Sequence, residues 1–268
     1  MRRTLRNKVV VITGGSSGIG LDAARRFAAH GAHVVLAARN RDRLERAKAE
    51  VESVGAKVLA VPTDVAVREQ VQRLLDATLE HFGRADIWIN NAGYGMVAWV
   101  EDTSPEEMRA IWEVNFMGVL HGSQVALQQM RRQESGHIIN ISSLAGRFAL
   151  PLNSAYAATK HAVNALGQSL ALELEGTGIR VSTIMPGLTE TPFFAASIRK
   201  VPEHGKSIVR AAPVSVVGEA IVRCALRPRE LIVLAPLGRW SLVLAEAFPF
   251  LYRAVARRYL QIRTAPGE

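Results

Sequence analysis

The feature that most constrains the fold is the glycine-rich turn at Thr13–Gly20 and the segments on either side of it. The β-branched run Lys8–Thr13 (KVVVIT) is typical of a strand that is buried on both faces. It leads directly into TGGSSGIG, after which apolar residues recur at helical spacing as far as His30-Gly31. A second apolar run, His33–Ala38, follows. A strand, a glycine turn, a helix and a strand within about thirty residues predict a βαβ unit whose turn binds a dinucleotide.

The three glycines of this turn have separate physical roles. Gly14 permits a tight exit from the strand, Gly18 lets the backbone approach a pyrophosphate, and Gly20 lets the helix pack closely on the sheet. The N-terminus of the helix then offers free N–H groups and a partial positive charge to phosphate. We therefore expect a phosphate-binding turn rather than a structural turn alone.

The end of the second strand is where such a unit selects its cofactor. An acidic residue there would hold the ribose hydroxyl of NAD, but this chain has Arg39-Asn40 and no carboxylate before Asp42. The Arg39 guanidinium can bind a 2′-phosphate with two hydrogen bonds, and the Ser16 hydroxyl can add another. The pattern favours NADP(H) over NAD(H). The alternative is that Arg39 only begins the next helix on its solvated side.

A second candidate motif is the pair Tyr156 and Lys160, four residues apart on a predicted helix over 153–175. That spacing puts the two side chains on one helix face. An ammonium beside a phenol favours the phenolate, so we expect the pKa of Tyr156 to lie below its free value of about 10. Such a phenol can give a proton to a substrate oxygen or take one from it. The spacing alone is equally typical of an ordinary exposed helix.

The rest of the chain continues to alternate strands with helices. Further strands are predicted at 57–62, 85–90, 136–142, 179–185 and 230–234, and further helices at 40–54, 67–82, 104–132 and 215–226. This order predicts an α/β fold, a Rossmann-type doubly wound parallel sheet of seven strands with helices on both faces. Residues 1–235 are expected to form a single cofactor-binding and catalytic domain, because 268 residues leave little room for two. Residues 236–268 are expected to be a C-terminal helical extension of it.

Three polar residues within this pattern are open to two interpretations each. Asp64 and Asn91 follow predicted strands, and they either contact adenine and neighbouring strand ends or serve as cap and turn residues. Asn115 lies inside a predicted helix, although asparagine is a mediocre helix former. Its side chain is either solvated or bonded to water and backbone in an active site.

Taken together, these motifs resemble those of the short-chain dehydrogenases/reductases. The matching residues are TGGSSGIG at Thr13–Gly20, NNAG at Asn90–Gly93, Asn115, Ser143, the pair Tyr156-x-x-x-Lys160, and PGLTETP from Pro186. They occur in the family's order over residues 7–234, and that ordered co-occurrence is far more specific than any one motif. The resemblance implies an enzyme that interconverts an alcohol and a ketone or aldehyde by hydride transfer with NADP(H).

The resemblance also implies a role for each catalytic residue, namely Asn115, Ser143, Tyr156 and Lys160. Tyr156 would be the general acid in reduction and the base in oxidation. Lys160 would hold the nicotinamide ribose and lower the pKa of Tyr156, while Ser143 would orient the substrate oxygen. Asn115 would anchor a water that links Lys160 to solvent.

The cofactor is expected, on the same resemblance, along the carboxyl ends of the strands. The backbone at Leu188 and Thr189 and the Thr191 hydroxyl would fix the nicotinamide carboxamide. The expected cofactor contacts are Gly14, Ser16, Ser17, Gly18, Ile19, Gly20, Arg39, Asp64, Val65, Asn91, Ala92, Gly93, Tyr156, Lys160, Pro186, Gly187, Thr189 and Thr191. Hydride transfer requires no metal, and no cluster of His, Cys and Asp in the sequence suggests one.

The loops expected around the substrate, 93–100, 144–152 and 193–213, are mainly apolar and aromatic. The candidate substrate contacts are Tyr94, Ser143, Phe148, Tyr156 and Phe193. This composition favours an apolar substrate, such as a lipid-, steroid- or retinoid-like alcohol or carbonyl compound. Two alternatives stay open: a carrier-bound 3-oxoacyl substrate, whose phosphate arm Arg147 and Arg199 could meet, and a non-catalytic cofactor-binding scaffold with the same fold.

The C-terminal extension is the least ordinary part of the chain. Residues 231–252 are very apolar, but Arg239 and Glu246 argue against a membrane-spanning helix, because each charge would cost about 2.5–3.5 kcal/mol at the bilayer centre. Residues 250–263 form the pattern of a basic amphipathic helix, with an apolar stripe of Leu251, Val255, Tyr259 and Ile262 and with Arg253, Arg257, Arg258 and Arg263 mainly elsewhere. This helix either packs over the substrate cleft or a partner subunit, lies on an anionic membrane surface, or is a loose tail.

Composition limits the expected partners, disulfide bonds and cellular location of the protein. The net charge of +9 is compatible with anionic nucleotides, membranes or nucleic acid, but no nucleic-acid recognition motif is present and no nucleic-acid partner is expected. The single cysteine, Cys224, cannot form an intramolecular disulfide. The basic N-terminus runs into a strand pattern with no signal peptide, so a cytoplasmic location is expected, either free or peripheral to a membrane. The family resemblance implies a homodimer or homotetramer built on the Asn115 and Tyr156 helices.

Overall fold

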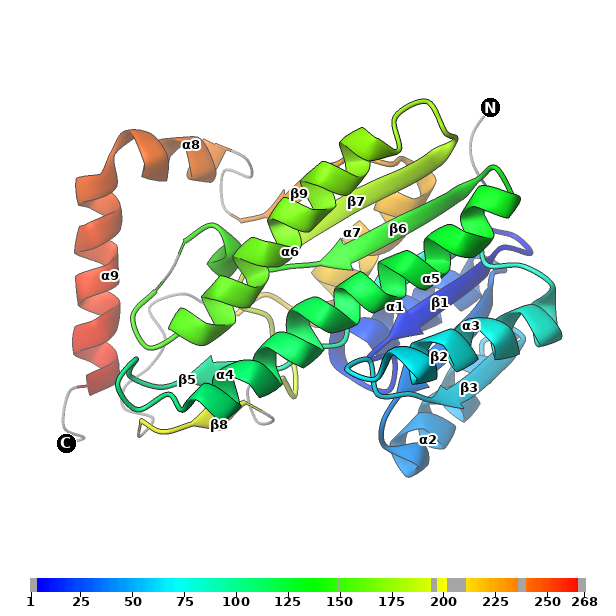
Figure 1. Ribbon diagram of the computed structural model, residues 1–268, viewed down its shortest axis with the longest axis horizontal. Helices are drawn as coiled ribbons and strands as arrows, with labels where there is room; N and C mark the ends of the chain where they lie inside the picture. Colours follow the sequence, from blue (N-terminus) through cyan, green and yellow to red (C-terminus); the bar gives the residue numbers. More distant parts are fainter. Residues whose placement is uncertain (1–3, 149, 194–196, 202–210, 236–239, 265–268) are drawn as a thin grey trace.

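The computed structural model describes residues 4–148, 150–193, 197–201, 211–235 and 240–264 (Figure 1). In this part of the chain the central feature is a sheet of seven parallel strands in the order β3-β2-β1-β4-β6-β7-β9. The strands are β1 Val9–Thr13, β2 His33–Ala38, β3 Val58–Pro62, β4 Ile87–Asn90, β6 Gly136–Ile141, β7 Ile179–Pro186 and β9 Leu231–Leu234. The predicted doubly wound fold is confirmed, and its strand order reverses between β1 and β4.

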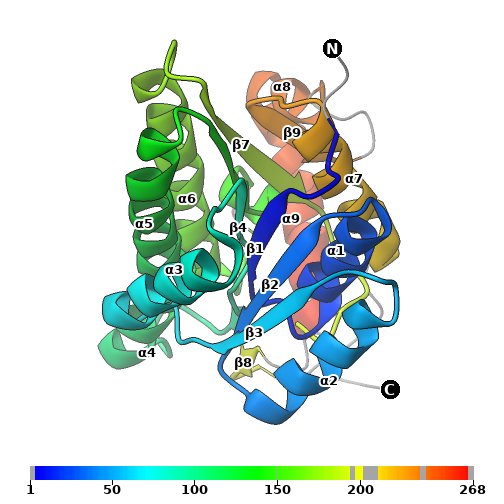
Figure 2. The same ribbon diagram turned by 90° about the vertical axis from the view of Figure 1, so that its right-hand side faces the viewer.

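Helices cover both faces of the sheet, as Figure 2 shows. The helices of one face are α1 Gly18–Ala29, α2 Arg41–Glu52 and α7 Val214–Leu226, and those of the other are α3 Arg68–Phe82, α5 Gly118–Arg132 and α6 Ser154–Glu173. Val10 and Ile12 of β1 pack under the first set, whereas Val9 and Val11 pack under the second. Because both faces of the strand are buried, both alternating sets of side chains must be apolar, and this explains its unbroken β-branched run.

The helix predicted over 104–132 is interrupted at Asn115. It begins as α4 Pro105–Trp112, where the side chains of Ser104 and Glu107 each accept a hydrogen bond from the other's backbone N–H. It then passes through a π-helical turn, η1 Glu113–Met117, before continuing as α5. The poor helix former therefore lies in a local bulge, a feature that often marks a functional position.

The structure contains a second, smaller sheet that the sequence pattern does not predict. In this sheet β5 Met96–Val97 pairs in parallel with β8 Ile198–Arg199, outside the main sheet. The backbone N–H of Ile198 donates to Gly95 O (3.0 Å). This pairing brings the segment after β4 beside the segment after β7, two regions expected to hold substrate.

The C-terminal extension contains two helices, α8 Trp240–Ala247 and α9 Pro249–Thr264, and the helix predicted over 250–263 lies within α9. No helix in the described part of the chain is long and apolar enough to cross a bilayer. Of the predicted apolar stripe, Leu251 is described and is exposed. The side chains of the remaining stripe residues and of one arginine lie outside the described residues: Val255, Tyr259, Ile262 and Arg263.

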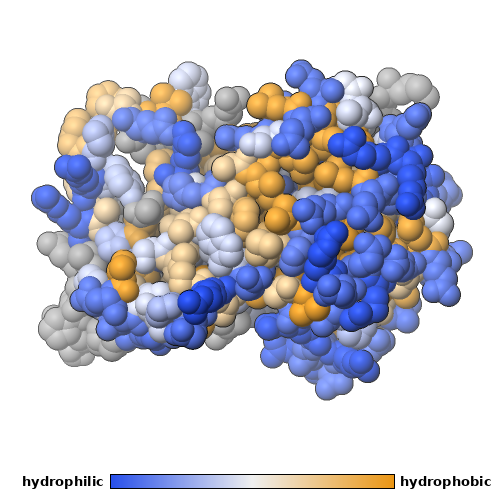
Figure 3. Space-filling view, viewed as in Figure 1, coloured by the Kyte–Doolittle hydropathy of each residue, from blue (hydrophilic) through white to orange (hydrophobic). Residues whose placement is uncertain are grey.

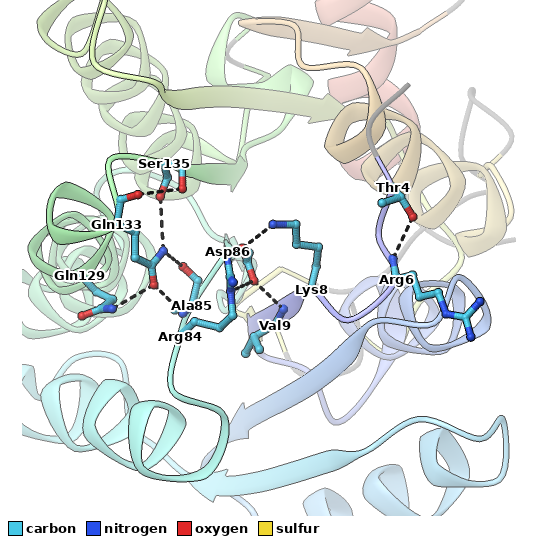
Figure 4. A network of polar contacts seen from close by, with 10 residues as sticks. All are labelled: Thr4, Arg6, Lys8, Val9, Arg84, Ala85, Asp86, Gln129, Gln133 and Ser135. Atoms are coloured by element: carbon cyan, nitrogen blue, oxygen red, sulfur yellow. Dashed lines mark hydrogen bonds and ion pairs between the residues drawn. The ribbon is translucent and has the colours of Figure 1, made fainter. Parts of the chain in front are cut away.

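A polar network ties the amino end of β1 to that of β4 (Figure 4). Asp86 accepts hydrogen bonds from Lys8 Nζ (2.9 Å), from the Val9 N–H (2.9 Å) and from two guanidinium nitrogens of Arg84. Burial raises the pKa of Asp86, but the hydrogen bonds from Arg84, Lys8 and Val9 outweigh burial and hold that pKa below its ordinary value. The carboxylate therefore stabilises the strand ends while it is ionised.

Replacing Asp86 with Asn should lower the free energy of unfolding by about 1–2 kcal/mol near pH 7, because Lys8 and Arg84 lose their shared carboxylate. The lowered pKa means that this contribution is present above about pH 4 and is lost as the pH falls further. Urea unfolding at pH 7 and at about pH 3 measures it, and the difference should shrink at the lower pH. Asp76→Asn, exposed on α3, is the control; equal losses in both variants at pH 7 would contradict the prediction.

Candidate functional site

The glycine turn between β1 and α1 lies at the carboxyl edge of the sheet, where the strand order reverses. Gly14 and Gly18 have φ angles of +65° and +55°, which L side chains rarely adopt. A Cβ on Gly14 would lie 2.9 Å from the Ala92 Cα, so the turn approaches the segment after β4 very closely. Ser17 precedes α1 with an extended backbone and makes no side-chain cap bond. The first N–H groups of α1 are therefore available to an anion.

Asn91 holds this turn against β4. Its Nδ2 donates to the carbonyl oxygens of Thr13 (2.9 Å) and Gly14 (3.2 Å). The Thr13 hydroxyl oxygen accepts from the backbone N–H groups of Asn91 (3.0 Å) and Ala92 (3.1 Å). The Asn91 side chain therefore contacts the end of the neighbouring strand β1, one of the contacts expected of it, and the same bonds hold the glycine turn.

The loop after β7 crosses the glycine turn. Its Thr191 side chain lies against Gly18, whose Cβ would be 3.5 Å from Thr191 Cγ2. Thr189 is buried and donates its hydroxyl to Gly187 O (3.0 Å), which stabilises the loop from within. Pro186 is the last residue of β7 and is buried too. The structure thus brings together the two ends of the expected cofactor site, which are more than 160 residues apart in the sequence.

Three arginines surround an open pocket of about 510 Å³ at the ends of β2 and β3. The lining residues are Arg39, Arg41, Pro62, Thr63, Asp64, Gln70 and Arg73. Within the described part of the chain, none of the three guanidinium groups forms an ion pair. Three cations against one carboxylate favour an anionic ligand. Arg41 and Arg73 are not evident from the sequence, because they join Arg39 only when α2 and α3 pack beside the strands.

The structure shows where the side chains of four expected cofactor residues lie. Asp64 forms a turn in which its Oδ1 accepts a hydrogen bond from the Ala66 N–H (3.0 Å). Asp64 also lines the arginine pocket. The Val65 side chain is buried against Gly118, and the Ile19 side chain packs on the α1 face of the core. Ser16 is partly exposed but does not line the arginine pocket, so the predicted contribution of its hydroxyl there has no support.

Tyr156 lies in the first turn of α6, beside the segment that follows β6. Its phenol hydrogen-bonds the Ser143 side chain. Ser143 has an extended backbone before the 3-10 turn η2 Leu144–Gly146, and its Oγ also accepts from the Ala145 N–H (3.1 Å). The Phe193 ring meets the Tyr156 ring edge-on at 5.7 Å. The expected catalytic pair Ser143 and Tyr156 is therefore in contact.

Lys160 and Asn115 both lie close to Gly93, and Lys160 also lies beside the Tyr156 ring. Lys160 is 4% exposed, and its Nζ donates to Ile141 O (3.0 Å) and lies 5.8 Å from the centre of the Tyr156 ring. Asn115 is fully buried, and its side chain exchanges two hydrogen bonds with the backbone of Tyr94 (3.0 and 2.9 Å). A Cβ on Gly93 would lie 3.0 Å from Asn115 Oδ1 and 3.7 Å from Lys160 Nζ. Glycine at 93 therefore leaves the space between these two groups open.

The titration of Tyr156 differs from the expectation. Burial raises its pKa to about 12, and the hydrogen bond from Ser143 offsets only part of that rise. Burial also lowers the pKa of Lys160 to about 8. The prediction of a lowered phenol pKa is thus wrong for the protein without ligands, because the Lys160 amine is directed at a carbonyl and burial disfavours both charged forms. The phenol keeps its proton at neutral pH.

The expected substrate residues divide into two groups. Tyr94, Tyr156, Met96 and Ile198 pack in one apolar cluster, and Phe193 joins it through Tyr156. Phe148 instead meets the ring of Tyr252 in α9, with their centres 5.9 Å apart. Its neighbour Arg147 pairs with Glu246 of α8. The C-terminal extension therefore contacts the segment that follows Ser143.

Two residues that support the site are hard to find from sequence. Thr159 is fully buried, receives a hydrogen bond from Asn115 Nδ2 (3.3 Å) and donates to Tyr156 O (2.7 Å). It lies immediately before Lys160, which is the one signal that could have drawn attention to it. Tyr252 has no local signal, because its position beside Phe148 depends on how α9 packs.

Comparisons with known proteins extend these observations. A family model described as short chain dehydrogenase matches residues 8–201. An uncharacterized oxidoreductase of Staphylococcus epidermidis is 39% identical over 188 residues, which cover 70% of this chain and 80% of that protein. A short chain dehydrogenase/reductase from Burkholderia phymatum, solved in complex with NAD, is 29% identical with a TM-score of 0.83, and the match covers 93% of this chain and 96% of that one. An alcohol dehydrogenase from the archaeon Thermococcus sibiricus, solved with 5-hydroxy-NADP, is 31% identical with a TM-score of 0.75. That match covers 85% of this chain and 96% of the other.

The lowered pKa of Lys160 predicts a pH-dependent stability. Between pH 8 and pH 10 the unfolded chain still holds a proton on this lysine that the folded chain has released, so stability rises with pH. Relative to Lys160→Met, the wild type should gain about 2–3 kcal/mol in free energy of unfolding over that range. Denaturant unfolding of both proteins at several pH values measures the gain. Lys57→Met, at an exposed position, is the control: it keeps Lys160, so its difference in stability from the wild type should not change with pH. A constant difference between wild type and Lys160→Met would contradict the prediction.

Proposed function

Since the chain belongs to the short-chain dehydrogenase family, and so is an NAD(P)-binding oxidoreductase of CH–OH groups, we propose that it interconverts an apolar alcohol and its ketone or aldehyde with NADP(H) and with Tyr156 as acid and base. The observation that carries the proposal is the set of contacts that joins Ser143 to Tyr156, Tyr156 to Lys160, and both Lys160 and Asn115 to the space beside Gly93. These residues come from the β6–η2 junction, α6 and the π-helical turn. A scaffold that only bound the cofactor would not need this arrangement.

The residues of the carboxyl edge fit a dinucleotide. Gly14 and Gly18 leave room where side chains would intrude, and the uncapped start of α1 suits a pyrophosphate. Thr189 and Thr191 would hold the nicotinamide end, and Lys160 would hold its ribose. When bound, NADP(H) supplies or accepts the hydride.

The arginine pocket supports NADP(H) over NAD(H). A 2′-phosphate carries the negative charge that Arg39, Arg41 and Arg73 can bind, and the pocket follows β2, where cofactors of this kind are distinguished. The one acidic residue of the pocket, Asp64, is engaged with the Ala66 N–H. Two of the solved structures similar to this chain hold NAD and a third holds 5-hydroxy-NADP, so the preference is argued from this chain's own arginines.

The raised pKa of Tyr156 keeps the phenol protonated at neutral pH, so a proton is present for the reductive direction, although the phenol is a weaker acid than a free one. A developing alkoxide on the substrate is a far stronger base than a phenolate, so it takes the proton from the phenol readily. Ser143, already bonded to that phenol, would hold the substrate oxygen beside it. In the oxidative direction the ammonium of Lys160, 5.8 Å from the ring, would favour the phenolate.

Two observations support an apolar substrate. Tyr156, Tyr94 and Ile198 pack against a buried apolar cluster that includes Met96, and the Phe193 ring meets the Tyr156 ring. Arg147, which could have met the phosphate arm of a carrier-bound 3-oxoacyl substrate, is already paired with Glu246. An uncharged alcohol or carbonyl compound with an apolar body therefore fits better than a carrier-bound one.

The chemistry is tested by following NADPH oxidation with a panel of apolar ketones and aldehydes. Tyr156→Phe should lower kcat/KM by about 10²–10⁴-fold, because it removes the proton donor and keeps the ring. NADPH binding, followed by fluorescence, should be largely retained. Ser53→Ala removes an exposed hydroxyl at the C-terminal end of α2 and should keep the activity. Turnover unchanged by Tyr156→Phe would refute the mechanism, and no turnover by the wild type would favour a scaffold.

The cofactor preference is tested with Arg39→Gln and Arg73→Gln. Each should raise the KM for NADPH about tenfold or more and leave the KM for NADH nearly unchanged, since a guanidinium–phosphate bond contributes about 1.5–3 kcal/mol. Arg46→Gln is the matched control, because it is exposed on α2 and does not line the pocket. Equal effects on NADPH and NADH would contradict a 2′-phosphate site.

A further inference from the structure

The helices α8 and α9 form an arm at one end of the molecule, beyond β9 (Figure 1). The chain turns sharply between α8 and α9, at Pro249, and α9 runs alongside this end of the molecule. The ion pair between Arg147 and Glu246 and the ring contact between Phe148 and Tyr252 join the arm to the segment after β6. The arm is thus fixed to the enzyme along one side and open on the other.

The open side of the arm carries an unusual share of exposed apolar surface. Eleven large hydrophobic side chains are exposed in the described part of the chain, and five of them lie within twelve consecutive residues of the arm. These five, here named the apolar corner, are Trp240 (69% exposed), Val243 (51%), Phe248 (43%), Phe250 (64%) and Leu251 (55%). Figure 3 shows hydrophobic side chains gathered where α8 meets α9. Surface of this kind requires an apolar or amphipathic partner.

The charge of the arm is strongly positive next to this corner. Arg253, Arg257 and Arg258 are exposed on α9, and none of them forms an ion pair with a described carboxylate. The only acidic residue between positions 231 and 263 is Glu246, which Arg147 already neutralises. The partner must therefore offer negative charge beside an apolar layer.

We propose that the arm docks the protein on the surface of an anionic lipid bilayer. The apolar corner would enter the boundary between headgroups and acyl chains, where tryptophan and phenylalanine are favoured, and the arginines would bind lipid phosphates. Neither helix can span the bilayer, so the contact is peripheral. A second copy of this chain is a poorer occupant, because pairing two arms would bring their arginines together on proteins that each carry a net charge of +9.

The geometry of the arm links this surface to the catalytic residues. The Phe148–Tyr252 contact joins α9 to the segment that begins at Ser143. A bilayer bound to the arm would therefore lie on the same end of the molecule as the segment that follows Ser143. The docking itself does not depend on the proposed substrate, and it is measured without turnover.

Co-sedimentation of the full-length protein with vesicles tests the proposal. The wild type should bind phosphatidylglycerol vesicles and bind pure phosphatidylcholine vesicles far more weakly, and high salt should reduce binding. The triple variant Arg253→Gln, Arg257→Gln, Arg258→Gln should weaken binding roughly a hundredfold, since each arginine near an anionic surface contributes about fivefold. The triple variant Trp240→Ser, Phe250→Ser, Leu251→Ser should lose binding even at low salt.

Matched controls separate docking from general charge and from misfolding. The triple Arg131→Gln, Arg132→Gln, Arg180→Gln and the single Leu172→Ser alter exposed residues away from the arm and should bind like the wild type. Thermal melting and cofactor binding confirm that each variant is folded. The proposal is overturned if the wild type does not sediment with anionic vesicles, or if the arm and control variants lose binding equally. It is also overturned if the serine variant changes only the oligomeric state in light scattering, which would identify a second copy as the occupant.

Discussion

The hydrogen bonds from Asn91 to the end of β1 hold together the geometry on which the whole site depends. The carboxyl ends of parallel strands lie at one edge of a sheet. Only where the strand order reverses do the segments that follow two neighbouring strands lead to opposite faces of the sheet. At that point Asn91 binds the carbonyl oxygens of Thr13 and Gly14, and Thr13 accepts the N–H groups that follow β4. The glycine turn and the segment leading to Gly93 are thereby fixed against each other. The phosphate end and the catalytic end of the site are positioned by one set of contacts.

The catalytic end carries a cost in stability. Lys160 and Asn115 are buried among apolar strands and helices, where polar groups are stable only if they are hydrogen-bonded. Ile141, Tyr94 and Thr159 provide those partners, and they do so from three separate segments. The π-helical turn at Asn115 is part of the same arrangement, since it sets the side chain among backbone groups. Burial then shifts the pKa of Tyr156 upward and that of Lys160 downward, so the unliganded protein keeps the phenol protonated at neutral pH.

The arm extends this arrangement to the surface. The sequence-based choices for the C-terminal helix were a cleft or subunit contact, a membrane surface, or a loose tail. The contacts of Arg147 and Phe148 with α8 and α9 argue against a loose tail. The exposed apolar corner lies beside arginines that pair with no described carboxylate, and this supports the proposed membrane surface. The same segment after Ser143 thus meets Tyr156 at one end and the arm at the other.

The sequence by itself determined the order of strands and helices and the nucleotide-binding turn, because these are recorded in local periodicity and in residue spacing. The four catalytic candidates followed from the resemblance of its motifs to those of the family. Only the tertiary structure decided that Asn91 binds backbone, that Arg41 and Arg73 join Arg39, and that a small second sheet brings Ile198 beside Tyr94. It also reversed the expected pKa shift of Tyr156. Each of these depends on burial or on contact between residues far apart in the chain, and neither quantity can be read from spacing along the chain.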